Sequence, residues 1–329
     1  MADLDSSLLC SFLAAGNQPV SGDRLAKELG VSRVAIWNRL ERLRNARFVF
    51  EASTRKGYVM KSVPTEIYPA LVEAHLLRLK FKPKFEFLAE VDSTNSEAER
   101  RLASGQTAPF VVLARLQNSG RGRLGRKWHS SHTGNLYLSL AFRPLIAPER
   151  LKPFTLWMGL ALCAHLEKTL GIRLGLKWPN DLLAPDGRKV AGMLTEARMD
   201  SDRVRECVFG LGLNITTQRE DFPEDLRYLA SSLVQISLTP LEINQIAAEI
   251  LQALWLAWED YESGTWQKSF RTFWERYDVL TGKVVKVGLL GEPKEGVVQG
   301  INDEGALLLR SPAGLTQVIS SGEVTLRKD

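Results

Sequence analysis

The sequence predicts a multidomain α+β protein, with a helical N-terminal domain, a mixed α/β domain in the middle and a small β domain at the end. Three observations lead to this fold class. Apolar residues recur at helical spacing near the N-terminus, strand and helix patterns then interleave irregularly, and the C-terminal region has short, glycine-punctuated strand patterns. A chain of 329 residues is long enough for several domains. The expected domain boundaries are 1–62, 66–278 and 279–329.

The N-terminal domain is expected to be a winged helix-turn-helix. The segments LLCSFLAA, DRLAKEL and RVAIWNRLERLRN have helical spacing, and Ser21 and Ser32 are placed to cap the second and third helices. Ile36, Leu40 and Leu43 form one apolar stripe on the third helix. The segment FVFEASTRKGYVM then alternates around a polar turn, as the two strands of a wing do. This order of elements is typical of a DNA-binding module.

Positive charge is concentrated in this domain. Between Ser21 and Met60 there are nine basic and four acidic residues, so this window carries the whole net charge of +5. The basic residues are Arg24, Lys27, Arg33, Arg39, Arg42, Arg44, Arg47, Arg55 and Lys56. Such a surface favours an anionic partner, although a basic face that is merely solvated is the alternative. The residues expected to contact DNA are Ser32, Arg33, Asn38, Arg39 and Arg42.

The middle of the chain mixes strands and helices. Pro64 and Pro69 mark a linker, and a helix is expected over 66–79. Strands are then expected at FEFLAEV, FVVLARLQ, NLYLSLAF, LGLKW, VAGMLTEARM and CVFGLGLNI. Further helices are expected at EAERRLAS, TLWMGLALCAHLEKTL and LEINQIAAEILQALWLAWEDYE. The irregular order predicts a mixed α/β domain.

The composition argues against several classes of protein. The longest apolar run, near 156–166, is far too short to span a membrane, and the N-terminus MADLDSS carries acids where a signal peptide carries lysine or arginine. Cys10, Cys163 and Cys207 are too widely spaced for a disulfide framework. The four histidines have no metal-ligand spacing, so no zinc site is predicted. We therefore expect a cytoplasmic protein that does not bind membranes.

The stretch GRGRLGRKW, residues 120–128, contains three arginines, one lysine and three glycines, and no acid. It lies between two predicted strands and is expected to be a loop beside a sheet. Glycine lets backbone N–H groups approach an anion, and arginine can donate two parallel hydrogen bonds to phosphate or carboxylate. The pattern is neither a P-loop nor a dinucleotide fingerprint. It predicts phosphate or carboxylate binding, with a solvated loop or a nucleic-acid contact as alternatives.

Five motifs follow one another in the middle of the chain: DSTN at 92–95, Q-x-x-GRGR-x-GR-x-W at 117–128, KWPNDL at 177–182, KVAGMLTE at 189–196 and GLGLNI at 210–215. Together they resemble the biotin–protein ligase family, whose members attach biotin to carboxylases. The N-terminal domain makes the chain similar to the bifunctional members, which also repress biotin-synthesis genes. The tail GALLL…GEVTLR resembles the SH3-like C-terminal domain of the family, so the resemblance covers essentially the whole chain.

This resemblance implies a fold and a reaction. The middle domain is expected to be a class II aminoacyl-tRNA-synthetase-like mixed sheet, and the tail an SH3-like β-barrel. Biotin and ATP are the expected substrates, with Mg²⁺ accompanying ATP and no other metal. They give biotinyl-5′-AMP and pyrophosphate, and biotin then passes to a lysine of a biotin carboxyl carrier protein domain. The adenylate is also the expected corepressor, which promotes a homodimer on operator DNA.

The resemblance also implies the site residues. The expected catalytic cations are Lys177, Arg121 and Arg123, and the expected biotin-binding residues are Ser93, Thr94, Asn95, Gln117, Arg121, Gly122, Arg123 and Lys177. Biotin's carboxylate is ionised at neutral pH, so its attack on the α-phosphate needs no general base, only cations that stabilise charge on the phosphate oxygens. Lys177 follows an apolar strand and precedes Pro179, which places its ammonium at a sheet edge.

Without the motifs, several of these residues have ordinary structural interpretations. Lys177 would be a solvated lysine at a strand end, and Ser93 a helix cap. The role of Asp181 stays open between placing Mg²⁺, orienting Lys177 and ending a turn. The family loop also often has a further arginine where Leu124 stands here.

Two other functions fit parts of the pattern. A transcription factor that senses biotin or its adenylate without catalysis would share the domains, but it would not need Lys177, Arg121 and Arg123 to stabilise phosphate charge. A lipoate ligase is related in fold and chemistry, but the pairing of GRGR-x-GR-x-W with KWPNDL disfavours it.

Overall fold

The computed structural model describes residues 3–53, 56–200, 202–288 and 293–326, which form two compact units. The first unit consists of the described residues up to Pro83 together with Leu241–Gln252. The second consists of Lys84–Pro240 and the described residues from Ala253 onward. Arg55, one of the basic residues of the N-terminal window, lies outside the described residues.

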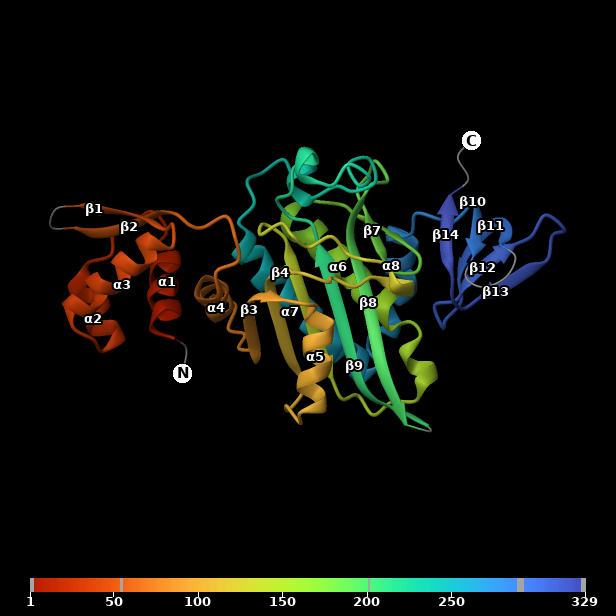
Figure 1. Cartoon of the computed structure of the whole chain (residues 1–329), viewed down its shortest axis with the longest axis horizontal. Coiled ribbons are helices and arrows are strands. Elements are labelled where there is room, and N and C mark those ends of the chain that lie inside the picture. Colours follow the sequence, from red (N-terminus) through yellow and green to blue (C-terminus); the bar gives the residue numbers. More distant parts are fainter. Residues whose placement is uncertain (1–2, 54–55, 201, 289–292, 327–329) are drawn as a thin grey trace. The chain divides into compact units, whose positions relative to one another are not determined.

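The first unit contains the predicted helices and hairpin (Figure 1). Its elements are α1 (Leu4–Ala15), α2 (Gly22–Leu29), α3 (Arg33–Asn45), β1 (Val49–Ser53), β2 (Gly57–Ser62), α4 (Pro69–Arg78) and the N-terminal part of α7 (Ile243–Ser263). The strands β1 and β2 pair antiparallel. The Ser21 hydroxyl accepts a hydrogen bond from the Arg24 backbone N–H, and the Ser32 hydroxyl accepts one from that of Ala35. Both predicted caps are therefore confirmed.

The core of this unit leaves one face of α3 free. The predicted stripe of Ile36, Leu40 and Leu43 is buried. It belongs to one apolar cluster with α1 and the hairpin, in which the rings of Phe12 and Phe50 lie 5.1 Å apart. Because the stripe faces inward, the opposite face of α3 is turned to solvent.

The helix expected over 66–79 begins later, at Pro69. The residue before a proline disfavours the helical conformation, and Tyr68 is extended. Asn244 of α7 holds this stretch: its Oδ1 accepts from the Tyr68 backbone N–H at 2.7 Å, and its Nδ2 donates to the Glu66 carbonyl at 3.2 Å. Pro69 is a local signal for the start of α4, whereas the contact with Asn244 joins residues far apart in the sequence and has no local signal.

The second unit is built on a mixed sheet. Within the described residues it has seven strands in the order β3-β4-β5-β9-β8-β7-β6, with β3 and β4 parallel and the other neighbours antiparallel. The strands are β3 (Phe85–Val91), β4 (Phe110–Gln117), β5 (Leu136–Phe142), β6 (Gly175–Lys177), β7 (Asp181–Leu183), β8 (Lys189–Asp200) and β9 (Arg203–Leu213). The helices are α5 (Thr94–Ala103), α6 (Phe154–Leu170), the C-terminal part of α7, α8 (Gln267–Tyr277) and the 3-10 turns η1 (Arg123–Gly125), η2 (Pro148–Leu151), η3 (Arg219–Asp221) and η4 (Leu233–Gln235). The prediction of a mixed α/β domain is confirmed.

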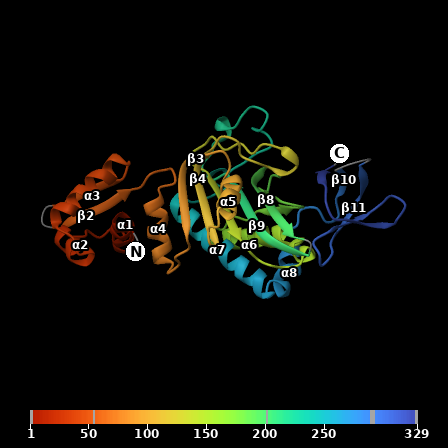
Figure 2. The ribbon, with the colours of Figure 1, turned by 60° about the horizontal axis from the view of Figure 1, so that its bottom comes forward.

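Helices cover both faces of this sheet. Figures 1 and 2 show α5 on one face, and α6 with the C-terminal part of α7 on the other. The rings of Phe142 in β5 and Trp258 in α7 stack with centroids 4.0 Å apart, and Phe154 of α6 meets Trp258 edge-on at 5.8 Å. Every residue of β5 is buried as a result. The buried sheet gives the site a rigid support.

Other elements of the second unit also differ from the predictions. The helix α8 and the short strand β7 were not predicted. The helix α5 begins at Thr94 rather than at Glu97, and Ser93 occupies the cap position without a side-chain capping hydrogen bond. The earlier start brings Thr94 and Asn95 into the first turn of the helix.

The C-terminal strands form a second sheet within the second unit. Its order in the described residues is β13-β12-β11-β10-β14, with all neighbours antiparallel. The strands are β10 (Val284–Gly288), β11 (Lys294–Ile301), β12 (Leu307–Arg310), β13 (Thr316–Ile319) and β14 (Glu323–Leu326). A small β domain was predicted here, and the described strands confirm it. Across the described chain, no helix is both long and apolar enough to cross a membrane.

Candidate functional site

A cavity of about 120 Å³ lies between the start of α5, the basic loop that follows β4, and strands β8 and β9. Its lining residues are Ser93, Thr94, Asn95, Gln117, Arg121, Gly122, Arg123, Arg126, Lys127, Trp128, Asn180, Asp181, Lys189, Gly192, Met193, Leu194, Gly210, Leu211, Gly212 and Glu323. Uncharged polar side chains come from α5 and β4, and most of the cations come from the loop. The cavity therefore places a neutral polar surface beside a positively charged one.

The neutral surface is a hydrogen-bond network around the first turn of α5. Gln117 Oε1 accepts from the Thr94 backbone N–H at 2.8 Å and from the Thr94 hydroxyl at 3.2 Å. Ser139 Oγ donates to Asn95 Oδ1 at 2.6 Å and lies 2.8 Å from Thr94 Oγ1. Thr94, Asn95 and Ser139 are all buried. The network therefore fixes uncharged donors and acceptors beside the cavity.

The basic loop is shaped by its own backbone. The Gly122 N–H donates to the Arg126 carbonyl at 2.7 Å, and the Trp128 N–H donates to the Gly120 carbonyl at 2.8 Å. Both bonds enclose the turn η1, and Leu124 within it has φ +55°, a left-handed conformation that is strained for leucine. Its side chain is 60% exposed, so backbone hydrogen bonds rather than a buried side chain shape the turn.

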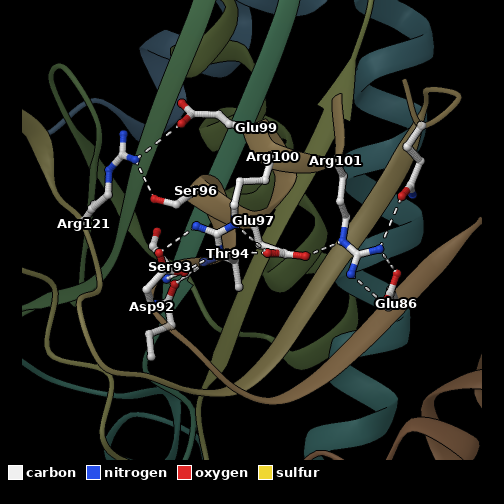
Figure 3. A network of polar contacts seen from close by, with 12 residues as sticks. Glu86, Asp92, Ser93, Thr94, Ser96, Glu97, Glu99, Arg100, Arg101 and Arg121 are labelled. Carbon is white, nitrogen blue, oxygen red and sulfur yellow. Dashed lines mark hydrogen bonds and ion pairs between the residues drawn. The ribbon is translucent and has the colours of Figure 1, made fainter. Parts of the chain in front are cut away.

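Arg121 contacts acidic and hydroxyl side chains. Its Nη1 donates to Ser96 Oγ at 2.8 Å and lies 3.6 Å from Glu99 Oε2, and both partners belong to α5 (Figure 3). Its Nη2 forms an ion pair with Glu196 of β8. Figure 3 also shows Arg100 paired with Asp92 of the DSTN motif, at 2.7 Å. The start of α5 is thus held by arginines on both sides.

Arg123 and Arg126 contact the C-terminal strands. Arg123 Nη1 donates to the Gly322 carbonyl at 3.2 Å and lies 3.5 Å from Asn180 Oδ1, so both of these partners are neutral. Arg126 forms an ion pair with Glu323 of β14. Burial lowers the pKa of Arg123, with Glu323 and Asp181 opposing that effect. A half-buried guanidinium with neutral partners is suited to receive an anion.

Lys177 is not among the described residues that line the cavity. It ends the edge strand β6, as predicted, and pairs in register with Asp181. Burial lowers the pKa of its ammonium, and Asp181 opposes the shift. Lys189, which does line the cavity, forms an ion pair with Asp181 at 2.6 Å. Lys177, Asp181 and Lys189 therefore form one charged cluster at this side of the cavity.

Glycines in β8 and β9 make room for Trp128. A Cβ added at Gly212 would lie 2.3 Å from Trp128 Nε1, and one at Gly192 would lie 3.0 Å from the indole ring. Lys189 Nζ lies 5.2 Å from the ring centroid. Trp128 Nε1 is buried, and within the described residues it has no hydrogen-bond partner. A buried donor without an acceptor beside a cavity is consistent with a site for a polar ligand.

The exposed face of α3 carries the residues predicted to contact DNA. Ser32 caps this helix, Arg33 and Asn38 are exposed, and Arg42 is 59% exposed. Arg39 is less accessible, at 29%, and donates to Asp5 Oδ1 at 3.1 Å. Trp37, on the same helix, is 51% exposed.

The structure brings together most of the predicted biotin-binding residues. Those that line the cavity are Ser93, Thr94, Asn95, Gln117, Arg121, Gly122 and Arg123. Lining residues that the sequence did not select include Trp128, Asn180 and Lys189, which belong to the quoted motifs and could have been found there. Glu323 also lines the cavity, but no local pattern in the C-terminal segment pointed to it.

The carboxylates that line the cavity in the described structure, Asp181 and Glu323, each form an ion pair with a lysine or an arginine. Among the described residues, no cluster of three or more His, Cys, Asp or Glu side chains could hold a metal ion.

Three segments of the chain match known protein families. Residues 87–214 match the Biotin/lipoate A/B protein ligase family. Residues 7–59 match the HTH domain family, and residues 281–327 match the Biotin protein ligase C terminal domain family. The order of these matches is the domain order predicted from the sequence.

Similar proteins extend over the full length. The bifunctional ligase/repressor BirA of Bacillus subtilis (strain 168) is 31% identical over 318 residues, 97% of each chain. The protein of the same name from Escherichia coli (strain K12) is 30% identical over 327 residues, 99% of each chain. The structure of the biotin protein ligase from Aquifex aeolicus in complex with biotin and ATP aligns with a TM-score of 0.62 and 27% identity, covering 75% of this chain and 99% of that one.

Proposed function

Because the chain belongs to the biotin protein ligase family, we propose that its cavity joins biotin to ATP and that the protein then attaches biotin to a carboxylase. The biotin carboxylate attacks the α-phosphate of ATP, which forms biotinyl-5′-AMP and releases pyrophosphate. A lysine amine of a biotin carboxyl carrier protein domain then attacks the carbonyl of this mixed anhydride, and AMP leaves. The observation that carries the proposal is the buried neutral network adjoining the arginines of the loop.

The neutral network suits the ureido ring of biotin. Ser93, Thr94, Asn95 and Gln117 offer hydroxyl and amide groups but no charge, which matches a ligand end that both donates and accepts hydrogen bonds. The indole of Trp128 offers an apolar surface beside Gly212 and an N–H that has no partner within the described residues. Biotin would therefore lie with its ring toward α5 and its carboxylate toward the loop.

Arg121, Arg123 and Lys177 are the cations we assign to the chemistry, with Gly122 allowing close approach of the backbone. Two anions must meet when a carboxylate attacks a phosphate, and fixed cations lower the cost of that approach and of the charge that develops. Arg123 is best placed, because its partners are neutral. Lys177 lies beside the cavity, in the cluster with Asp181 and Lys189, and would extend toward the phosphates.

Mg²⁺ would enter with ATP. This ion is commonly held by one or two carboxylates together with phosphate oxygens and water. Asp181 fits that role, since it lines the cavity, and its ion pair with Lys189 would have to rearrange for the ion to bind. The ion would supply charge neutralisation at the phosphates, and no other metal is proposed.

We assign the domains to residues 1–62, 66–278 and 279–329, in keeping with the three family matches. The central sheet would be of the class II aminoacyl-tRNA-synthetase type. The five short antiparallel strands β10 to β14 would form an SH3-like barrel. Gly322 and Glu323 reach the loop, so this domain would help to hold the active site.

The helix-turn-helix supports a second role, as a repressor of biotin-synthesis genes. The residues proposed to contact operator DNA are Ser32, Arg33, Asn38, Arg39 and Arg42. Biotinyl-5′-AMP would act as corepressor by promoting a homodimer, whose spacing matches the half-sites of the operator. Both roles place the protein in the cytoplasm, where its carrier domain and DNA are found.

The test is transfer of labelled biotin to a carrier domain. With ATP and Mg²⁺ present, we expect label on the carrier lysine and release of pyrophosphate. A protein that binds biotin but releases no pyrophosphate would be a sensor without ligase activity. Competition between biotin and lipoate separates this function from that of a lipoate ligase, because only biotin should be transferred.

A further inference from the structure

The side chain of Glu196 joins the neutral network to the basic loop. Its Oε2 accepts a hydrogen bond from Asn95 Nδ2 at 2.8 Å. Its Oε1 forms the ion pair with Arg121. Asn95 is buried, and its remaining bonds go to Ser139 and to the Leu194 carbonyl, so its amide has one fixed orientation. One carboxylate thus contacts both a ligand-binding amide and a loop cation.

Arg121 is tied to α5 as well as to Glu196. Its Nη1 donates to Ser96 Oγ and faces Glu99, and these residues lie on the helix that also carries Asn95. Figure 3 shows the contacts of the guanidinium with α5, and its ion pair with Glu196 adds a link from the loop to β8. Its donors are planar and fixed, so displacement of one partner changes the geometry of the others.

We propose that Glu196 is a positioning residue that couples occupation of the biotin network to the placement of the basic loop. This inference rests on the proposed ligase function. Glu196 is one of the three partners that hold the Asn95 amide, and it also pairs with Arg121. A ligand that fixes Asn95 would also fix Glu196, and through it the basic loop at the edge of the cavity. The loop would then shield the mixed anhydride from water.

Glu99 provides a matched comparison. It belongs to α5 and faces the same guanidinium, at 3.6 Å, and it is exposed to a similar degree as Glu196, at 29% and 25%. Among the hydrogen bonds of the described residues, Asn95 is bonded to Glu196 and not to Glu99. Removing the charge of Glu99 therefore weakens the hold on Arg121 without touching Asn95.

The experiment compares Glu196→Gln and Glu99→Gln in the full-length protein. An amide in place of Glu196 keeps one acceptor but cannot serve both partners, so biotin binding without ATP should weaken by about tenfold, the cost typical of a hydrogen bond to a charged group. The fraction of biotinyl-5′-AMP lost to hydrolysis rather than transferred should also rise. Glu99→Gln should keep the biotin affinity within about twofold, the range of a weak exposed ion pair.

Arg121→Ala separates the two halves of the coupling. It removes the loop contact and leaves Asn95 bonded to Glu196, so it should raise hydrolysis with a smaller loss of biotin affinity. In the Arg121→Ala background, Glu196→Gln should add no further hydrolysis. If Glu196→Gln is unstable, the Arg121→Ala variant still tests the Glu196–Arg121 contact, because it removes the other member of the pair.

The outcomes are distinct. Wild-type biotin affinity and hydrolysis in a folded Glu196→Gln, or fully additive hydrolysis in the double variant, would overturn the role of Glu196. A wild-type protein that binds biotin but forms no adenylate would instead contradict the ligase function itself. A lower melting temperature of Glu196→Gln with unchanged binding and hydrolysis would show that Glu196 only stabilises the fold.

Discussion

The indole of Trp128 lies directly against Gly212, so that a methyl group at Gly212 would come within 2.3 Å of Trp128 Nε1. Trp128 ends the basic loop, and Gly212 belongs to the buried strand β9. The absence of a side chain at one position in the sheet therefore determines where the end of the loop can lie. The same relation holds between Gly210 and Asn95, where the methyl group would lie 2.1 Å from Oδ1.

Gly212→Ala should therefore displace Trp128 and weaken biotin binding. Overpacking of this kind costs about 1–3 kcal/mol, which corresponds to a loss of affinity from about fivefold to more than about a hundredfold if it opposes binding. Titration calorimetry with biotin measures it. Gly288→Ala is the control, because among the described residues a Cβ there would meet only Pro293, at 4.0 Å. Equal affinities of the two variants would show that Trp128 is not part of the biotin site.

Lys177→Ala should keep the fold but reduce adenylate formation by at least about a hundredfold, as loss of one preorganised cation does. The ammonium must be charged to act. Burial lowers the pKa of Lys177 below the usual 10.5, so this ammonium loses its proton at a lower pH than an ordinary lysine does. The rate of the wild-type protein should therefore begin to fall at a correspondingly lower pH as the pH rises. The Lys177→Ala variant should not show this fall in rate. Pyrophosphate release across the pH range checks both effects, with the exposed Lys168→Ala as control.

DNA binding should depend strongly on salt, because it rests on cations of the N-terminal domain. Arg42→Ala should weaken binding to the biotin-operon promoter and reduce the slope of log affinity against log salt by about 0.9, the value for one phosphate contact. Gel retardation with biotin and ATP present measures this at several salt concentrations. Failure of the wild-type protein to retard this promoter at low salt would exclude the repressor role.

Asp5→Asn should act in the opposite direction. The Asp5 carboxylate lies 3.1 Å from Arg39 and 3.6 Å from Arg42, and therefore competes with DNA phosphates for both. Its removal should strengthen DNA binding severalfold at low salt, with less effect at high salt. Weaker binding by this variant would show instead that Asp5 holds the two arginines in the orientation that DNA requires.

The ion pair between Asp92 and Arg100 gives a pH dependence of stability. Hydrogen bonds from Arg100 lower the pKa of Asp92 from 3.8 to about 2. The pair therefore stabilises the folded state above pH 3.8, and its contribution is lost as the pH falls toward 2. Because both side chains are about half exposed, the contribution is at most about 1 kcal/mol.

Asp92→Asn should accordingly lower the melting temperature at neutral pH and approach the wild type in acid. Thermal melting followed by circular dichroism over the acid range tests this. A difference that stays constant as the carboxyl group of the wild type becomes protonated would show that another interaction of Asp92 is responsible.

Local patterns in the sequence accounted for most of the fold. Capping serines, apolar periodicity and glycines marked α2, α3 and β4 because those signals lie within each element. The helix α8 had such a signal in Phe270, Trp274 and Tyr277, at helical spacing and buried, and it could have been predicted. The strand β7 has only three residues and exists because it pairs with β8, so no local pattern announces it.

The site, like the fold, has some residues that the sequence signals locally and some that it does not. The motifs allowed Ser93, Thr94, Asn95 and Gln117 to be predicted as site residues, since each motif lies at the edge of one element. The contacts that set the loop could not be predicted. Glu196 meets Arg121 across 75 residues, and Gly322 meets Arg123 across 199. Such pairs depend on how β8 and β14 are placed in the folded unit, which no stretch of sequence encodes locally.

A crystal structure of the protein with biotinyl-5′-AMP tests the proposed site most directly. We expect the ureido ring against Asn95 and Gln117, and both Arg123 and Lys177 within hydrogen-bonding distance of the acyl phosphate. An adenylate bound elsewhere, or bound in the cavity with Arg123 still on the Gly322 carbonyl and Lys177 turned away, would rule out the proposed role of these cations.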